Sequence, residues 1–222
     1  MKKHIVCFGD SNTHGYCAVP SDCADGGTRF HEKERWTCLL QEKLGEEYLV
    51  IEEGLSGRTT VFDDPLEEGL SGLELITPVL MSHEPVDLLV IMLGTNDTKD
   101  RFGASAACIS LGLERLVAKA KGTACWSEDV PRILVIAPPH IRAGLGASPV
   151  GEIMGQDCVE KSCKLAEAYR GVCERQGCSF LDAEGLAEVN QQDCMHLTKR
   201  GHAQLACALE KRILDADGSV MG

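Results

Sequence analysis

Five short apolar runs, separated by longer segments with helical spacing, constrain the fold of this chain more than any other feature. The runs are rich in Val, Ile, Leu or Phe, and the central ones are apolar on both faces, as is typical of strands buried between two layers of helices. They lie at residues 4–9, 48–54, 87–94, 132–139 and 178–183. We therefore expect five parallel strands.

The segments between the runs repeat apolar residues at helical spacing, and several of them end at a glycine or ahead of a proline. The expected helices cover residues 35–45, 71–83, 105–122, 155–177 and 198–216. Alternation of strand and helix along the whole chain predicts an α/β fold, a three-layer α/β/α sandwich with right-handed crossovers. We expect a single domain over residues 1–222, with residues 17–35 and 139–155 as loops above one edge of the sheet.

The charge balance argues against two classes of partner. The chain has 22 Lys and Arg against 34 Asp and Glu, a formal net charge of −12, which repels phosphate backbones and anionic lipid surfaces. The first apolar run stops at Gly9, too early for a signal-peptide core, and no stretch approaches the roughly 20 apolar residues of a membrane span. We expect neither a nucleic acid nor a membrane as partner.

Twelve cysteines are scattered through the expected helices and strands, and no Cys-x-x-Cys pair occurs. The spacing typical of zinc knuckles and dithiol redox centres is therefore missing. We interpret the cysteines as reduced, mostly buried small apolar residues in a cytoplasmic protein.

Polar residues follow several of the expected strands, at the edge of the sheet where ligands bind in folds of this kind. Ser11 comes after the first run, Gly57 after the second and Asn96 after the third, while Asp193 and His196 follow the fifth at some distance. A hydroxyl, an imidazole, a carboxylate and hydrogen-bond donors are the groups that an acyl-transfer site requires.

Each of these residues also has a simpler interpretation. Ser11 is either a nucleophile or a helix N-cap, and the Asp193–His196 spacing suits a catalytic pair as well as a surface turn. Asn96 can donate to a substrate oxygen or tie its own loop, and Gly57 can offer its N–H to an oxyanion or satisfy a turn. Asp10, next to Ser11, is a candidate substrate contact or a loop-holding carboxylate.

Taken in order, four segments of the sequence resemble the SGNH hydrolases, also called GDSL-type esterases. FGDSNTHG resembles the first block of that family, GLSGRTT the second, LGTNDTK the third and DCMHLTKRGH the fifth. Further similarity in VIEEGLSGRTTVFDDP and VIMLGTNDTK points to the branch that contains arylesterases and acyltransferase-like esterases.

The resemblance implies a flavodoxin-like SGNH hydrolase fold and a serine ester hydrolase without cofactor or metal. It implies that Ser11, Asp193 and His196 are catalytic and that Ser11, Gly57 and Asn96 form the oxyanion hole. It also implies short acyl esters of aryl alcohols or carbohydrates as substrates, acyl transfer to other alcohols, and a homo-oligomer. Tyr16 and the two expected loops depart from the family pattern, which makes Tyr16 a candidate substrate contact.

Three alternatives remain open from the sequence. A thioesterase or lysophospholipase would use the same residues with a different pocket. A metal-dependent phosphoesterase would use Asp10, Asn96, Asp193 and His196 as ligands. A carbohydrate-binding module on the same scaffold would not need Ser11 or His196 for chemistry.

Overall fold

The computed structural model describes residues 1–148 and 150–218, and its centre is one parallel sheet. The strands are β1 (Lys3–Gly9), β2 (Tyr48–Gly54), β3 (Leu88–Met92), β4 (Ile133–Ala137) and β5 (Ser179–Asp182), in the spatial order β2-β1-β3-β4-β5. All four pairings between neighbouring strands are parallel. The predicted five-stranded parallel sheet is therefore confirmed, with every strand ending on the same edge.

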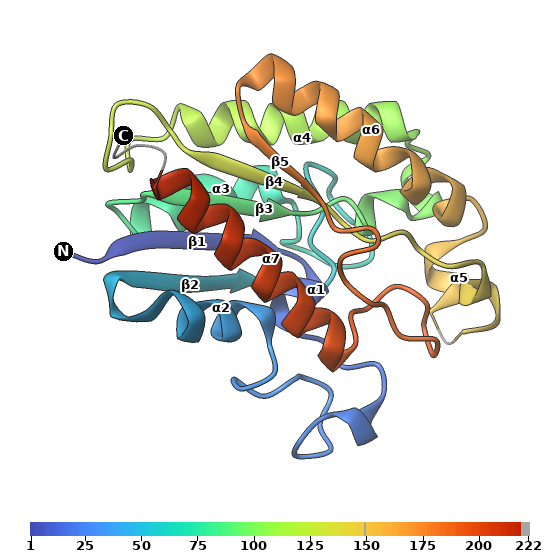
Figure 1. Cartoon of the computed structure of the whole chain (residues 1–222). Helices are drawn as coiled ribbons and strands as arrows, with labels where there is room; N and C mark the ends of the chain where they lie inside the picture. Colours follow the sequence, from blue (N-terminus) through green and yellow to red (C-terminus); the bar gives the residue numbers. More distant parts are fainter. Residues whose placement is uncertain (149, 219–222) are drawn as a thin grey trace.

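Helices cover both faces of the sheet, which confirms the predicted three layers (Figure 1). The longer helices are α2 (Trp36–Leu44), α3 (Gly72–Ser82), α4 (Ala106–Lys121), α6 (Cys158–Gln176) and α7 (Lys199–Gly218). The short ones are α1 (Ser11–His14), α5 (Gly151–Met154), η1 (Pro20–Asp22), η2 (Gly45–Glu47), η3 (Asn96–Thr98), η4 (Asp100–Phe102) and η5 (Ala143–Ala147).

Alternate residues of the strands feed two separate cores, because successive side chains of a strand point to opposite faces. On one face Val6 and Phe8 of β1 pack with α3, α4 and α6. On the other face Ile5 and Cys7 pack with α2 and α7. The central strands β3 and β4 are buried along their whole length, as their apolar runs predict.

The two segments expected as loops contain short helical turns. Residues 17–35 include η1, and residues 139–155 include η5 and α5. Leu145 and Met154 bury their side chains in a small apolar cluster of this region, which explains why the second segment folds back on itself rather than running as an open loop. Both segments are loops, as expected, and the short helical turns within them were not predicted.

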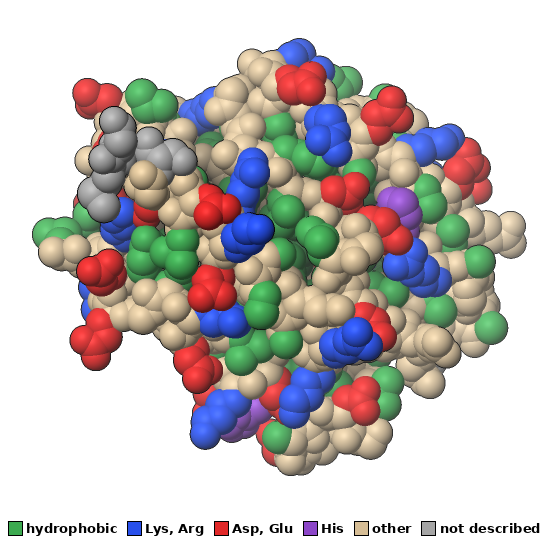
Figure 2. Space-filling model, viewed as in Figure 1, with side chains coloured by type: hydrophobic (Ala, Val, Ile, Leu, Met, Phe, Trp, Pro, Cys, Tyr) green, Lys and Arg blue, Asp and Glu red, His purple; other side chains and the backbone are tan. Residues whose placement is uncertain are grey.

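Charged side chains of both signs are interspersed over the face that Figure 1 presents (Figure 2). No helix in residues 1–148 and 150–218 is long and apolar enough to cross a membrane. All twelve cysteine thiols are free, and seven of these residues are buried, in agreement with the interpretation as small core residues.

Candidate active site

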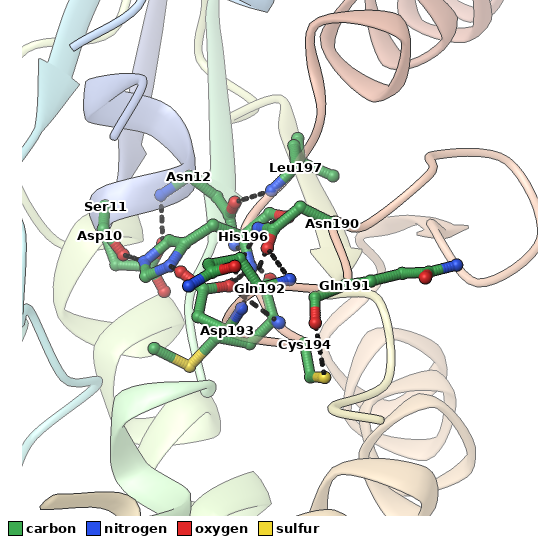
Figure 3. Close-up of polar contacts among 11 residues, drawn as sticks. Asp10, Ser11, Asn12, Asn190, Gln191, Gln192, Asp193, Cys194, His196 and Leu197 are labelled. Atoms are coloured by element: carbon green, nitrogen blue, oxygen red, sulfur yellow. Dashed lines mark hydrogen bonds and ion pairs between the residues drawn. The ribbon is translucent and has the colours of Figure 1, made fainter. Parts of the chain in front are cut away.

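Ser11 and His196 come together above the carboxyl edge of the sheet from opposite ends of the chain. Ser11 begins α1 directly after β1, and its Oγ lies 2.8 Å from Nε2 of His196. The other imidazole nitrogen, Nδ1, lies 2.6 Å from Oδ2 of Asp193 (Figure 3). All three residues are buried, with exposed fractions of 8%, 5% and 3% for Ser11, His196 and Asp193. The serine hydroxyl, imidazole and carboxylate thus form one continuous chain of hydrogen bonds.

The carboxylate of Asp193 is stabilised as an anion. Burial alone would raise its pKa, but the hydrogen bond and charge of His196 outweigh burial and hold the pKa of Asp193 at about 2. Its Oδ1 also accepts the backbone N–H groups of Met195 and His196. A carboxylate held in this way fixes the orientation of the ring and favours a proton on its Nδ1.

Asn190 supports this loop and was not singled out from the sequence. Its Nδ2 donates to Oδ1 of Asp193 and to the carbonyl of His196, both at 2.8 Å, and its Oδ1 accepts the N–H of Asp193. Cys194 lies between Asp193 and His196 in the sequence. It is the only non-glycine residue with a positive φ, 64°, in residues 1–148 and 150–218. The tight turn that aims Asp193 at His196 is therefore closed by one side-chain amide.

The turn that carries Ser11 is fixed by Asp10. Oδ1 of Asp10 accepts the N–H of Asn12 at 2.9 Å, which caps α1, and its backbone carbonyl accepts the N–H of His14. Asp10 is 1% exposed, so its carboxyl lies behind Ser11 rather than on the crevice wall. Burial raises the pKa of Asp10 to about 6, against smaller lowering effects of the Asn12 N–H, His196 and Arg58.

Gly57 and Asn96 lie beside Ser11, on loops after β2 and β3. Gly57 has φ 86°, and a Cβ there would lie 2.7 Å from Cδ1 of Leu70, so only glycine fits this turn without strain. Asn96 begins η3, and its Nδ2 donates to the carbonyl of Arg58 at 3.1 Å. Both residues line the same crevice as Ser11.

A crevice of about 550 Å³ opens over these groups. Ser11, Tyr16, Gly57, Asn96 and His196 line it, whereas Asp193 and Asp10 stand behind the lining. The Tyr16 ring packs on the His196 ring with centroids 4.5 Å apart. The rest of the lining combines apolar side chains with charged ones, namely Leu70, Val150, Ile153, Met154 and Met195 with Glu67, Glu68 and Lys99.

The four ligands of the phosphoesterase alternative do not gather as a metal site. In residues 1–148 and 150–218, no group of three or more His, Cys, Asp or Glu side chains is arranged to hold a metal ion. Asp193 and His196 bind each other instead, and Asn96 binds the Arg58 carbonyl.

The fold is that of the SGNH class of hydrolases, and comparison with known proteins agrees. The model of the GDSL-like lipase/acylhydrolase family matches residues 7–204, and the chain belongs to this family. No curated protein gives a significant match.

Solved structures of similar proteins overlay almost the whole chain. An aryl esterase of M. smegmatis is 35% identical with a TM-score of 0.86, covering 96% of this chain and 99% of its own. A carbohydrate acetylesterase of Sinorhizobium meliloti is 33% identical with a TM-score of 0.85, covering 97% and 100%. A putative arylesterase of Agrobacterium tumefaciens is 34% identical with a TM-score of 0.82, covering 96% and 99%.

Proposed function

We propose that the chain, as a single domain over residues 1–222, is a serine hydrolase of short acyl esters of aryl alcohols or carbohydrates. The observation that carries the proposal is the 2.8 Å contact between Oγ of Ser11 and Nε2 of His196, backed by Asp193 at 2.6 Å. The aryl esterase and carbohydrate acetylesterase among the similar structures support the choice of substrate class.

In the first half-reaction, His196 accepts the proton of Ser11 as Oγ attacks the ester carbonyl. The negative charge that develops on the carbonyl oxygen is stabilised by the backbone N–H groups of Ser11 and Gly57 and by the amide of Asn96. Asp193 stabilises the imidazolium that forms, and His196 then gives the proton to the departing alcohol. The products are the free alcohol and an acyl group bound to Ser11.

In the second half-reaction, water attacks the acyl-Ser11 ester while His196 again takes and returns a proton, which releases the acid and restores the serine. Another alcohol in place of water gives acyl transfer, and we include this activity in the proposal. The preference for small acyl groups in this proposal follows the carbohydrate acetylesterase among the similar structures. Tyr16, which packs on His196, contacts the bound ester.

Labelling and substrate length test the proposal. A fluorophosphonate probe should label wild type and fail to label Ser11→Ala and His196→Ala that remain folded by circular dichroism. Hydrolysis of p-nitrophenyl acetate should exceed that of the octanoate, and faster turnover of the octanoate would favour the thioesterase or lysophospholipase alternative. Absence of labelling in the folded wild type would favour the carbohydrate-binding module.

We further propose a cytoplasmic location and a homo-oligomer. The twelve free thiols support a reducing compartment such as the cytoplasm. A homo-oligomer is implied by the resemblance, and light scattering of the purified protein tests it.

A further inference from the structure

Two carboxyl groups of the crevice take no part in the proposed mechanism. Glu67 and Glu68 line the crevice together with Ser11 and His196, and both side chains are exposed. Neither makes an ion pair with any residue of 1–148 and 150–218. Their charges therefore act on whatever occupies the crevice.

The turn that carries Glu67 is rigidly anchored. The N–H of Glu67 donates to the carbonyl of Asp64 at 3.2 Å, and the N–H of Leu66 donates to the Asp64 carboxylate at 3.1 Å. That carboxylate is fully buried and pairs with Lys99 at 3.3 Å and with Arg101 at 2.5 Å. The backbone of this turn is thus tied to a buried ion-pair cluster.

The same cluster holds the basic lining group of the crevice away from solvent. Among the described residues, Lys99 is the only Lys or Arg that lines the crevice. Its side chain is 4% exposed and its ammonium is committed to Asp64. Asp64 faces both Lys99 and Arg101, so the cluster keeps one net positive charge. Glu67 and Glu68 carry two unpaired negative charges against it, which leaves this side of the crevice net negative, and the formal charge of −12 on the whole chain adds to the negative potential.

Glu67 also lies close to the proposed oxyanion hole. A Cβ built on Gly57 would lie 2.9 Å from Oε2 of Glu67, so the carboxylate rests against the glycine whose N–H is proposed to bind the oxyanion. A negative charge at this place opposes the build-up of negative charge on the substrate. A positive charge on the substrate would offset that repulsion.

We propose that Glu67, assisted by Glu68, makes the crevice selective for esters that carry a positive charge, as a quaternary or primary ammonium group, and disfavours anionic esters. This inference rests on the proposed esterase function. The aromatic ring of Tyr16, on the lining of the same crevice, adds a face that attracts such cations. Glu67 acts as a specificity-determining residue.

Pairs of esters with the same shape and different charge test the proposal, with the charge placed in the alcohol of one pair and in the acyl group of the other. One pair is acetylcholine and 3,3-dimethylbutyl acetate, in which a tert-butyl group replaces the trimethylammonium group of the alcohol. The other pair is the ethyl ester of betaine and ethyl 3,3-dimethylbutanoate, in which the same replacement is made in the acyl group. The quantity measured is the ratio of kcat/KM for the charged and the neutral ester of each pair. Comparing this ratio between variants removes differences in intrinsic reactivity.

In Glu67→Gln, the ratio should fall about five- to tenfold for at least one pair, and further in Glu67→Gln/Glu68→Gln. The fall should come from the cationic ester alone, while kcat/KM of the neutral ester stays equal or rises, an opposite response that a merely structural change would not produce. Raising salt to about 0.5 M should reduce the wild-type ratio.

Glu128→Gln is the matched control, because it removes the same charge from an exposed turn before β4, away from the crevice lining. Its ratio should equal that of wild type. A ratio that changes less than twofold in Glu67→Gln for both pairs overturns the proposal while leaving the esterase intact. No hydrolysis of any ester by folded wild type would instead overturn the proposed function, and this inference with it.

Discussion

The side-chain oxygen of Asn12 accepts the backbone N–H of Leu197 at 2.8 Å, although 185 residues separate the two in the chain. The amide nitrogen of Asn12 donates to the carbonyl of Met195 at 3.3 Å. Asn12 follows Ser11 and its two partners flank His196, so one side chain joins the serine turn to the histidine loop (Figure 3). We expect the 2.8 Å contact between Ser11 and His196 to depend on this link.

We expect Asn12→Ala to lower kcat for p-nitrophenyl acetate by about tenfold to a hundredfold, because a small displacement of reacting groups is costly. The free energy of unfolding should fall by about 1–3 kcal/mol, since two buried backbone groups lose their partner. Steady-state kinetics and denaturant unfolding measure the two effects.

Gln192→Ala is the control for Asn12, because the Gln192 side chain is an exposed amide of the same histidine loop. It should leave kcat unchanged. An Asn12→Ala enzyme with the kcat of wild type would show that the two loops hold their places without this amide.

The strands and long helices were predictable because their signals are local. Each strand coincides with an apolar run. The helices α4 and α6 end directly before Gly122 and Gly177, the stop signals in the sequence. Some apolar runs are longer than their strands, because the residues that follow the last strand pairing are still buried. Leu93, for example, lies beyond the end of β3 and is still fully buried.

The supporting contacts of the site were not predictable, because they depend on the path of distant loops. The sequence places Asn12 next to Ser11 and Asn190 near Asp193, but nothing local shows which backbone groups these amides meet. The helical turn α5 arises from the burial of Met154 in a local cluster and has no signal of its own. Glu67 and Glu68 look like an ordinary solvated acidic pair until the turn at Asp64 brings them to the crevice.

Removal of the Asn96 amide tests the proposed oxyanion hole. We expect Asn96→Ala to lower kcat for p-nitrophenyl acetate by about 10² to 10³, with little change in KM, because the donor acts mainly on the charge that develops during reaction. Asn96→Asp keeps the shape of the side chain and loses the donor, so it should be impaired as well. Activity of Asn96→Ala within threefold of the parent would show that the amide only ties its loop to the Arg58 carbonyl.

Arg58 joins the ends of β1 and β2 beneath the site. Its Nη1 donates to the carbonyls of Gly9, at 2.9 Å, and of Glu53, and its guanidinium lies 4.1 Å from the centroid of the Phe8 ring. We expect Arg58→Met to lower the free energy of unfolding by about 2–4 kcal/mol, because it leaves two carbonyls without a charged donor. Arg58→Lys, which restores one charged donor, should lose less. Equal unfolding midpoints in urea for Arg58→Met and wild type would contradict this role.

Asp97 makes the stability of the protein depend on pH. Its Oδ1 accepts the N–H of Thr60 at 2.9 Å, while its Oδ2 is buried without a hydrogen-bond partner among the described residues. Burial raises the pKa of Asp97 from 3.8 to about 6, against the opposing hydrogen bonds from Thr60. The folded chain therefore holds this proton more tightly than the unfolded chain. The resulting stability is fully present below about pH 4 and is lost as pH rises through about 6.

Asp97→Asn removes this titration and keeps an oxygen for Thr60. We compare the free energy of unfolding of Asp97→Asn with that of wild type at each pH. The difference in favour of Asp97→Asn should be larger at pH 7 than at pH 4 by up to roughly 3 kcal/mol, because a shift of one pKa unit corresponds to about 1.4 kcal/mol. Urea unfolding at both pH values gives the comparison, and Asp63→Asn, at an exposed position nearby, should show no such change. A difference between Asp97→Asn and wild type that is the same at pH 4 and pH 7 would mean that Asp97 is ionised throughout this range, and that the buried Oδ2 is stabilised by a donor such as an internal water molecule.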